Sequence, residues 1–367
     1  MLIRYGKEQD GKLIKKAVVY TRDEHRINFV DVDRDAVFIC SRLRANNHES
    51  YIVGGAVRDL ILGKKPKDFD IVTRASPARI KQLFRNSRII GKRFRLVHVY
   101  FGPRIFEVST FRSLKDGHTG NTYGTIEEDV LRRDFSINAL FYDPGKQLVV
   151  DYVRGMNDIK KGVLRPIIPA KLIFKDDPVR MIRAVKYAVI GGFDIPWLLK
   201  RRIQNEAPLL NQISHSRLTE ELAKIIRSPA ASQIVESLEN TGLYCYLQKE
   251  ASVLMKCNPV FRKAYLASLE KAAKAVTPSG GISPPGQPLA ALIRDFLDLN
   301  TPWHELKKGS REDYRAVFSE ARRFILPMNP PRVELDKALR IVFGAHGIEI
   351  KKTRLFERER SRSLSDL

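Results

Sequence analysis

The fold is decided by residues 51–70, YIVGGAVRDLILGKKPKDFD. A short apolar run ends at Gly54-Gly55, and apolar residues then recur at helical spacing, which predicts a strand, a tight turn and a helix. Glycines at the start of a helix expose bare backbone N–H groups, and these groups suit a phosphate. A tight turn alone would also use two glycines, so this half of the stretch predicts a phosphate seat only together with the half that follows.

The second half of the stretch carries Asp68 and Asp70. Two carboxylates two residues apart on a strand point to the same face, where they can hold a hard divalent cation beside a phosphate. Such a pair is also compatible with a solvated strand end, and Arg58 with Asp59 would be an ordinary surface pair. Because a phosphate seat and a carboxylate pair follow each other within twenty residues, we predict metal-dependent transfer of a nucleotide.

Three later segments extend the pattern. They are RRDFSINAL at 132–140, DDPVRMIRA at 176–184 and SRLTEEL at 216–222. Together with 51–70, and in this order, they resemble the motifs of the class II tRNA nucleotidyltransferase/poly(A) polymerase family. The resemblance runs from about Thr21 to Leu222. It implies an α+β fold, in which a polymerase-beta-like nucleotidyltransferase head with a mixed sheet precedes an all-α region.

The resemblance also implies two-metal chemistry with Mg²⁺, for which Mn²⁺ is an alternative, and this chemistry generally uses three carboxylates. Asp68 and Asp70 are expected to be catalytic and to bind the metals. Asp134, in the second motif, is the third carboxylate that the resemblance favours, and its alternative role is an ion pair with Arg133. Glu107 is a rival, because it lies in an alternating stretch that predicts a neighbouring strand.

The same resemblance assigns eight residues to the nucleotide. Two glycines and Arg58 are expected at the triphosphate, two residues of the second motif near the sugar and phosphates, and three residues of the third motif at the base and phosphates. These residues are Gly54, Gly55, Arg58, Arg133, Asn138, Asp177, Arg180 and Arg183.

Asp177 and Arg180 carry hydrogen-bonding groups that can select a base. Adenine presents an amino donor beside a ring-nitrogen acceptor, which an aspartate and an arginine match. Cytosine presents the same pair, whereas guanine and uracil present the opposite one. The competing interpretation is that Asp176 and Asp177 only cap the helix that begins at Pro178.

Within the family, the segment Ile89–Val99 (IIGKRFRLVHV) resembles poly(A) polymerases rather than CCA-adding enzymes. We therefore predict an RNA-polyadenylating enzyme that uses ATP, needs no template, and acts in mRNA processing and decay. The alternative is a CCA-adding tRNA nucleotidyltransferase that uses CTP and ATP. A catalytically idle RNA-binding or nucleotide-sensing protein is disfavoured, because every expected catalytic position is filled.

Composition agrees with a polyanionic partner, because 65 Lys and Arg face 42 Asp and Glu, a net charge of +23. Basic clusters with interleaved aromatics are predicted to bind RNA 3′ ends through Lys92, Arg93, Arg95, Lys351, Lys352 and Arg354. No apolar run has the length of a membrane span, and no signal pattern opens the chain. Three distant cysteines favour reduced thiols in a cytoplasmic protein. Protein partners are not indicated.

We expect seven segments along the 367 residues. They are a basic leader and first helix (1–50), the catalytic head (51–165), a helical neck that binds base and RNA (166–228), a helical body (229–276), a linker or exposed loop (277–287), a helical C-terminal arm (288–350) and a basic, disordered tail (351–367).

Overall fold

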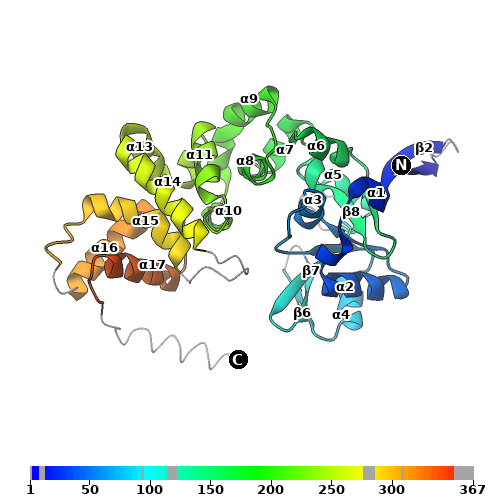
Figure 1. Cartoon of the computed structure of the whole chain (residues 1–367), viewed down its shortest axis with the longest axis horizontal. Coiled ribbons are helices and arrows are strands. Elements are labelled where there is room, and N and C mark those ends of the chain that lie inside the picture. The colour runs from blue at the N-terminus through cyan, green and yellow to red at the C-terminus, as the bar shows by residue number, and fades with distance from the viewer. Residues whose placement is uncertain are drawn as a thin grey trace. The chain divides into compact units, whose positions relative to one another are not determined.

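The computed structural model describes residues 2–7, 13–91, 95–113, 122–275, 286–306 and 310–350. Two compact units divide the chain, Met1–Glu206 and Ala207–Leu367, and Figure 1 follows both from N- to C-terminus. Their boundary cuts through the segment 166–228, which the sequence predicted as one helical neck. The first part of that segment therefore belongs to the same unit as the head.

A nine-stranded mixed sheet forms the frame of the first unit. Its strand order is β1-β2-β9-β8-β3-β4-β7-β6-β5. β4 pairs with β7 in parallel, and the other neighbouring pairs are antiparallel. The strands are β1 (Leu2–Lys7), β2 (Leu13–Tyr20), β3 (Ser50–Val53), β4 (Asp70–Thr73), β5 (Ser87–Ile90), β6 (Leu96–Phe101), β7 (Arg104–Thr110), β8 (Leu140–Asp143) and β9 (Leu148–Asp151).

The sheet of the head extends beyond the predicted boundary at residue 51. β2 pairs with β9 over Val18–Tyr20, so the basic leader supplies strands to the head. The apolar run Ala17–Tyr20 has the β-branched composition that packs well on a sheet. Ala17 is buried in the same hydrophobic cluster as Tyr51 and Val72, which lie in strands that sequence analysis assigned to the head.

Nine α-helices accompany the strands in the described part of the first unit. They are α1 (Arg22–His25), α2 (Arg34–Ala45), α3 (Gly55–Ile61), α4 (Pro77–Leu83), α5 (Ile126–Leu131), α6 (Gly155–Lys161), α7 (Ala170–Asp176), α8 (Val179–Gly191) and α9 (Trp197–Glu206). Local chemistry fixes their starts. Asp33 accepts hydrogen bonds from two backbone N–H groups of α2, and Ser76 accepts one from α4, whose first residue is Pro77. Both helices thus begin where a side chain satisfies free backbone N–H groups.

The connection from α3 to β4 corrects one expectation. β4 begins at Asp70, and its partner in β3 is Val53, the last residue before the glycine turn. Because Gly54 turns the chain away, nothing remains in β3 to pair with the residues before Asp70. Asp68 therefore precedes the strand and does not share its pleat.

Helices build the described part of the second unit. They are α10 (His215–Ile226), α11 (Ala231–Asn240), α12 (Tyr244–Leu247), α13 (Lys249–Cys257), α14 (Pro259–Lys274), α15 (Gln287–Asn300), α16 (Arg311–Phe324) and α17 (Arg332–Ala345). Phe296 of α15 stacks on Phe324 of α16 with ring centroids 4.1 Å apart. The predicted linker 277–287 lies outside the described residues as far as residue 285, and Gln287 already begins α15. The predicted tail 351–367 also lies outside them.

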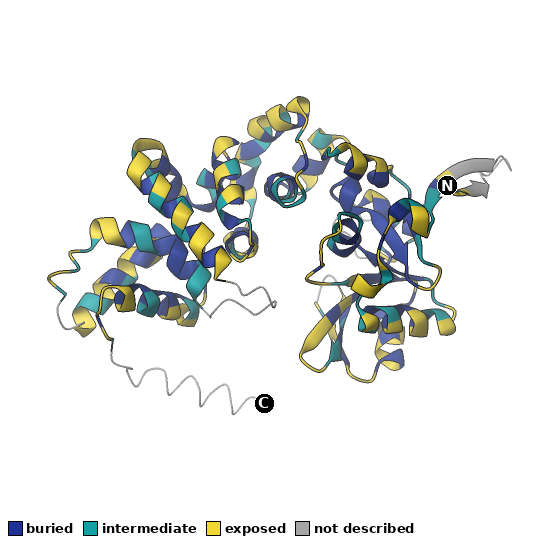
Figure 2. Ribbon diagram, viewed as in Figure 1, coloured by how far each residue is buried: buried dark blue, intermediate teal, exposed yellow. Residues whose placement is uncertain are grey.

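Buried residues occupy the strands of the sheet and the packed sides of the helices (Figure 2). Cys40 is buried, and all three cysteines are free thiols, as the sequence predicted. Among the described residues, none of the helices combines the length and the apolarity needed to cross a membrane.

Candidate active site

The glycine turn after β3 lies at the centre of the site. Gly54 adopts φ +72°, a conformation that favours glycine, and it caps α3. A Cβ at Gly54 would lie 3.7 Å from Asp70 Oδ2 and 3.9 Å from Arg133 Nη1. The turn therefore brings bare backbone between a carboxylate and a guanidinium, as expected for a surface that receives a phosphate.

Arg58 lies beside this turn, because a Cβ at Gly55 would be 3.6 Å from its Nη2, but its guanidinium is engaged by protein partners. Its side chain is buried, its Nη1 donates to Asn138 Oδ1 at 2.8 Å, and its Nη2 lies 2.7 Å from Asp59 Oδ1. The guanidinium also lies over the ring of Tyr187 at 5.3 Å. Arg58 thus ties α3 to Asn138 and α8. The predicted triphosphate contact of Arg58 stays a prediction. The alternative of an ordinary surface pair is wrong for Arg58, which is buried, whereas Asp59 is half-buried.

Asp70 and Glu107 are neighbours across the parallel pair of strands. Ile71 in β4 is paired with Val108 in β7, so the residues just before them, Asp70 and Glu107, come side by side. Protein atoms crowd the Asp70 carboxylate although the residue as a whole is exposed. This crowding, then repulsion by Glu107, and more weakly by Asp68, raise the pKa of Asp70 to about 6 against the attraction of Arg133.

Mutual repulsion of carboxylates is the electrostatic condition that a bound cation relieves. The three oxygen donors, Asp68, Asp70 and Glu107, are of the hard type that Mg²⁺ prefers. In the described residues, no three acidic, His or Cys side chains already converge on one point. The chemistry of Asp68, Asp70 and Glu107 nevertheless fits a divalent cation. Binding one would require these three side chains to come together.

Asp134 has a different environment. Its side chain is buried, and Arg183 Nε and Nη2 both lie 2.8 Å from its Oδ2. Its Oδ1 accepts from Phe135 N at 2.8 Å and from Asn138 Nδ2 at 3.3 Å. Burial opposes ionisation of Asp134, but Arg183 and these hydrogen bonds outweigh it and hold the pKa below its ordinary value. Asp134 therefore already has partners for both oxygens, and none of them is Asp70.

The predicted base-reading pair lies where α7 passes into α8. Asp177 Oδ1 accepts from Val179 N at 3.3 Å, and Asp177 Oδ2 lies 4.0 Å from Arg180 Nε. One Asp177 oxygen thus contacts the backbone of the helix start, and the other faces Arg180. Arg180 is buried, and its Nη2 donates to the carbonyl of Arg132 at 2.9 Å. Its Nη1 has no hydrogen-bond partner among the described residues.

A buried guanidinium nitrogen without a partner is costly, because its hydrogen-bonding capacity is lost from water. Arg180 borders an open pocket, so an acceptor on a ligand would satisfy Nη1 there. This orphan donor is the observation that points to a bound base.

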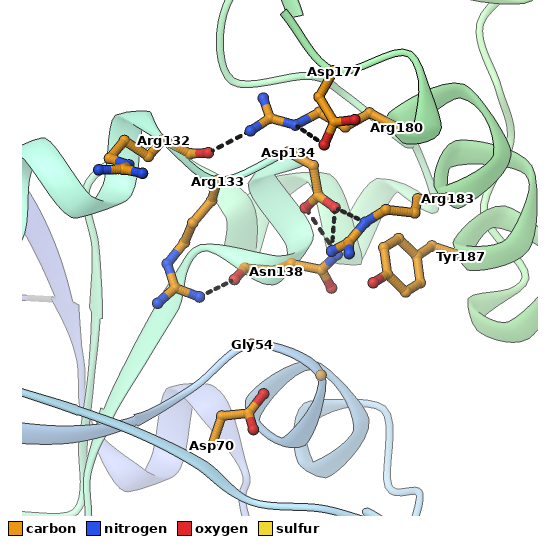
Figure 3. A pocket seen from close by; sticks show the side chains of 11 residues that line it. Gly54, Asp70, Arg132, Arg133, Asp134, Asn138, Asp177, Arg180, Arg183 and Tyr187 are labelled. Carbon is orange, nitrogen blue, oxygen red and sulfur yellow. Dashed lines mark hydrogen bonds and ion pairs between the residues drawn. The ribbon is translucent and has the colours of Figure 1, made fainter. Parts of the chain in front are cut away.

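One pocket of about 260 Å³ collects most of the predicted residues (Figure 3). It is lined by Gly54, Gly55, Asp70, Arg132, Arg133, Asp134, Asn138, Asp177, Arg180, Arg183 and Tyr187. Arg133 reaches it from the end of α5, where its Nη2 pairs with Asp129 Oδ2 at 3.0 Å and its Nη1 donates to the Asn138 carbonyl at 3.2 Å. Four arginines on one wall suit a polyphosphate.

Sequence reasoning missed two lining residues. Arg132 donates through Nη1 to the Ser113 carbonyl at 2.8 Å and offers its own carbonyl to Arg180. Tyr187 follows Arg183 by four residues on α8, so the helical period from Arg183 would have placed it on the same face. Asp68, Arg58 and Glu107 are not among the lining residues.

The predicted RNA-binding clusters are only partly described. Arg95 is exposed just before β6, whereas Lys92 and Arg93 lie outside the described residues. Lys351, Lys352 and Arg354 lie outside them as well. RNA binding by these six residues stays a prediction.

Comparison with known proteins finds two matching domain families and several relatives. A family model described as "Poly A polymerase head domain" matches residues 50–165, and one described as "Probable RNA and SrmB- binding site of polymerase A" matches residues 192–255. Poly(A) polymerase I of Escherichia coli O6:H1 is 43% identical over 229 residues, which cover 58% of this chain and 49% of that protein. This chain therefore spans about half the length of that relative.

Two further similarities point to the CCA-adding branch. The CC-adding tRNA nucleotidyltransferase of Halalkalibacterium halodurans is 36% identical over 231 residues, 62% of this chain and 58% of that protein. The crystal structure of the Bacillus stearothermophilus CCA-adding enzyme in complex with CTP matches with a TM-score of 0.58 and 26% identity, over 85% of this chain and 82% of that one. With both domain matches, these relatives show that the chain belongs to the tRNA nucleotidyltransferase/poly(A) polymerase family.

Proposed function

We propose that this chain is a template-independent polynucleotide adenylyltransferase that transfers AMP from ATP to RNA 3′ ends. The observation that carries the proposal is the single pocket that joins the glycine turn, Asp70, the arginine wall, and the Asp177–Arg180 pair. Phosphate-binding, cation-binding and base-reading groups thus face one space. mRNA processing and decay in the cytoplasm is the physiological setting that we propose with it.

In this proposal the pocket orients ATP from two ends. Asp177 accepts from the adenine amino group, and Arg180 Nη1 donates to the ring nitrogen beside it. Arg133 and the backbone at Gly54-Gly55 face the phosphates. Arg183 contributes positive charge to the same wall, where the ion pair with Asp134 holds it in place.

Asp70, Glu107 and Asp68 would hold Mg²⁺, which supplies charge neutralisation at the triphosphate and activation of the attacking 3′-hydroxyl when it is bound. We assign the third carboxylate to Glu107, because it neighbours Asp70 and raises its pKa. This assignment replaces the sequence-based choice of Asp134, whose two oxygens are already engaged by Arg183, Asn138 and Phe135. Asp134 then acts as a positioning residue for Arg183.

CCA addition is the second candidate function. It is favoured by the CC-adding and CCA-adding relatives, and the Asp177–Arg180 pair matches the cytosine edge as well as the adenine edge. Polyadenylation is preferred because identity is higher to the poly(A) polymerase I relative, and because Ile89–Val99 resembles that branch.

The deciding experiment supplies the purified chain with Mg²⁺, with ATP, CTP or both together, and with two acceptors. One acceptor is an RNA without a tail, and the other is a tRNA that lacks its CCA end. Extension of the first RNA with ATP by many nucleotides supports polyadenylation, and limited addition of C and A to the tRNA alone supports the second candidate.

Asp70→Asn serves as the control for contaminating enzymes. The absence of any addition by the unmodified chain to either acceptor, with either nucleotide, would refute both candidate functions.

A further inference from the structure

The strands beyond Glu107 carry a row of polar side chains that the pocket does not include. Glu107 in β7 is paired with His98 in β6, and His98 is paired with Arg88 in β5. His98 Nε2 lies 3.6 Å from Glu107 Oε1. Because directly paired residues project to the same face of a sheet, the row runs from Asp70 through Glu107 and His98 to Arg88.

Within the described residues, this face of the β5–β6–β7 sheet is open, with Arg88, Ile105 and Glu107 exposed and His98 and Tyr100 half-buried, whereas its opposite face is covered. Val97, Val99 and Val108 alternate with the polar row and are buried on the side of α4, which packs against β5, β6 and β7. Figure 1 shows α4 beside β6 and β7. On the open side, Ile105 is 52% exposed and the side chain of Glu107 is 55% exposed.

An aromatic ring completes the open face. Tyr100 follows His98 by two residues on β6, so it projects to the same side, and the two rings meet edge to face with centroids 6.3 Å apart. Tyr100 is paired with the exposed Ile105 of β7. The far side of Glu107 is thus bordered by a cation (Arg88), two rings (His98 and Tyr100) and an apolar side chain (Ile105).

We propose that this open face, made of Arg88, His98, Tyr100 and Ile105, seats the last nucleotides of the RNA acceptor strand. The inference rests on the proposed function, because it takes RNA as the acceptor. Single-stranded RNA is bound by aromatic rings that stack on bases and by cations that contact the backbone. Arg88 supplies the cation, and Tyr100 and His98 supply the rings.

The dimensions agree with this assignment. Arg88 lies two strands from Glu107, which is about 10 Å at a strand spacing of about 4.8 Å. A stacked strand advances about 3.4 Å per nucleotide, so about three nucleotides span the row. An RNA whose 3′-hydroxyl lies at Asp70 and Glu107 would therefore extend over Tyr100 and His98 and place a phosphate near Arg88.

The test uses the full chain with a short unstructured RNA, and compares Arg88→Ala and Tyr100→Ala with Arg79→Ala. Arg79 is an exposed arginine on α4, at the covered side of the sheet, so its removal changes the net charge as Arg88→Ala does. His98 is left unchanged, because its ring lies close to Glu107.

We expect the KM for RNA to rise in both test variants while the KM for ATP is unchanged. Tyr100→Ala should raise the KM for RNA about 5- to 150-fold through the lost stacking. Arg88→Ala should also reduce the log–log salt slope of RNA binding by about 0.7. Arg79→Ala should match the unmodified protein.

A second measurement locates the RNA directly. An acceptor with a photoreactive base near its 3′ end should crosslink to Ser87–Ile90 or Leu96–Phe101 in the Asp70→Asn protein. Unchanged KM values for RNA in both variants, or crosslinks confined to other segments, would overturn the inference and leave the proposed function standing. Failure of the unmodified chain to extend any RNA would instead refute the proposed function.

Discussion

Replacing Arg180 by Ala should weaken the choice of adenine. Arg180 Nη2 is engaged by the Arg132 carbonyl, and Nη1 is buried without a partner, so one donor is available to a ligand. Adenine offers that donor a ring-nitrogen acceptor, whereas guanine offers an N–H that cannot pair with it. Arg180 therefore favours the use of ATP and disfavours the use of GTP.

The structure sets the size of the effect. A hydrogen bond to a charged group contributes about 1.5–3 kcal/mol, and the residue is buried, so the upper part of this range is not lost to water. At about 1.36 kcal/mol for each factor of ten, the ratio of kcat/KM for ATP to that for GTP should fall about 10- to 150-fold. The Arg132 carbonyl also loses its partner, which lowers activity with all nucleotides and does not change the ratio.

Single-nucleotide addition to an RNA, measured with each of the four triphosphates, gives this ratio. Arg180→Lys is the matched variant, because it keeps the charge but lacks the planar fork, and it should lose most of the discrimination. Arg201→Ala, an exposed arginine on α9, is the control and should leave the ratio unchanged. A normal ATP-to-GTP ratio in Arg180→Ala would refute the assignment and show that the base is read elsewhere.

Four further predictions follow from the same unit. Glu107→Gln should reduce turnover by orders of magnitude with normal thermal stability. Asp134→Asn should mainly lower the free energy of unfolding in urea titrations, by about 3 kcal/mol, because it leaves Arg183 without its buried partner; the reverse pattern would restore Asp134 as the third carboxylate. Gly54→Ala should cost about 1–3 kcal/mol, because φ at this position is +72°, and should impair nucleotide addition; unaltered stability and KM for ATP would contradict this. Burial lowers the pKa of His25, whose ring accepts one backbone N–H and contacts a backbone carbonyl. The unfolded chain therefore binds the proton more readily, and stability should fall as pH drops below about 6.5, the unfolded value. Melting temperatures of the unmodified protein and His25→Gln between pH 7.5 and 5.5 check this, and equal slopes would exclude His25 as the cause.

The sequence determined the local chemistry of the site. The glycine turn, the caps at Asp33 and Ser76, and the helix start at Pro178 depend on neighbouring residues, and the structure contains all of them. Motifs far apart in the sequence were assigned to one site through family resemblance. Nine of the predicted residues line one pocket, although no spacing in the sequence shows that they meet.

Strand pairing decided the rest. The parallel register of β4 and β7 sets Glu107 beside Asp70, and the path of the chain after Pro178 sets Arg183 on Asp134. The pairing of β2 with β9 likewise makes the leader part of the sheet. A one-residue change of register would turn Glu107 to the other face without altering any local preference. The sequence by itself therefore determined which side chains the site has and where its helices begin, and only the tertiary structure decided which carboxylate faces which, because that depends on contacts between residues far apart in the chain.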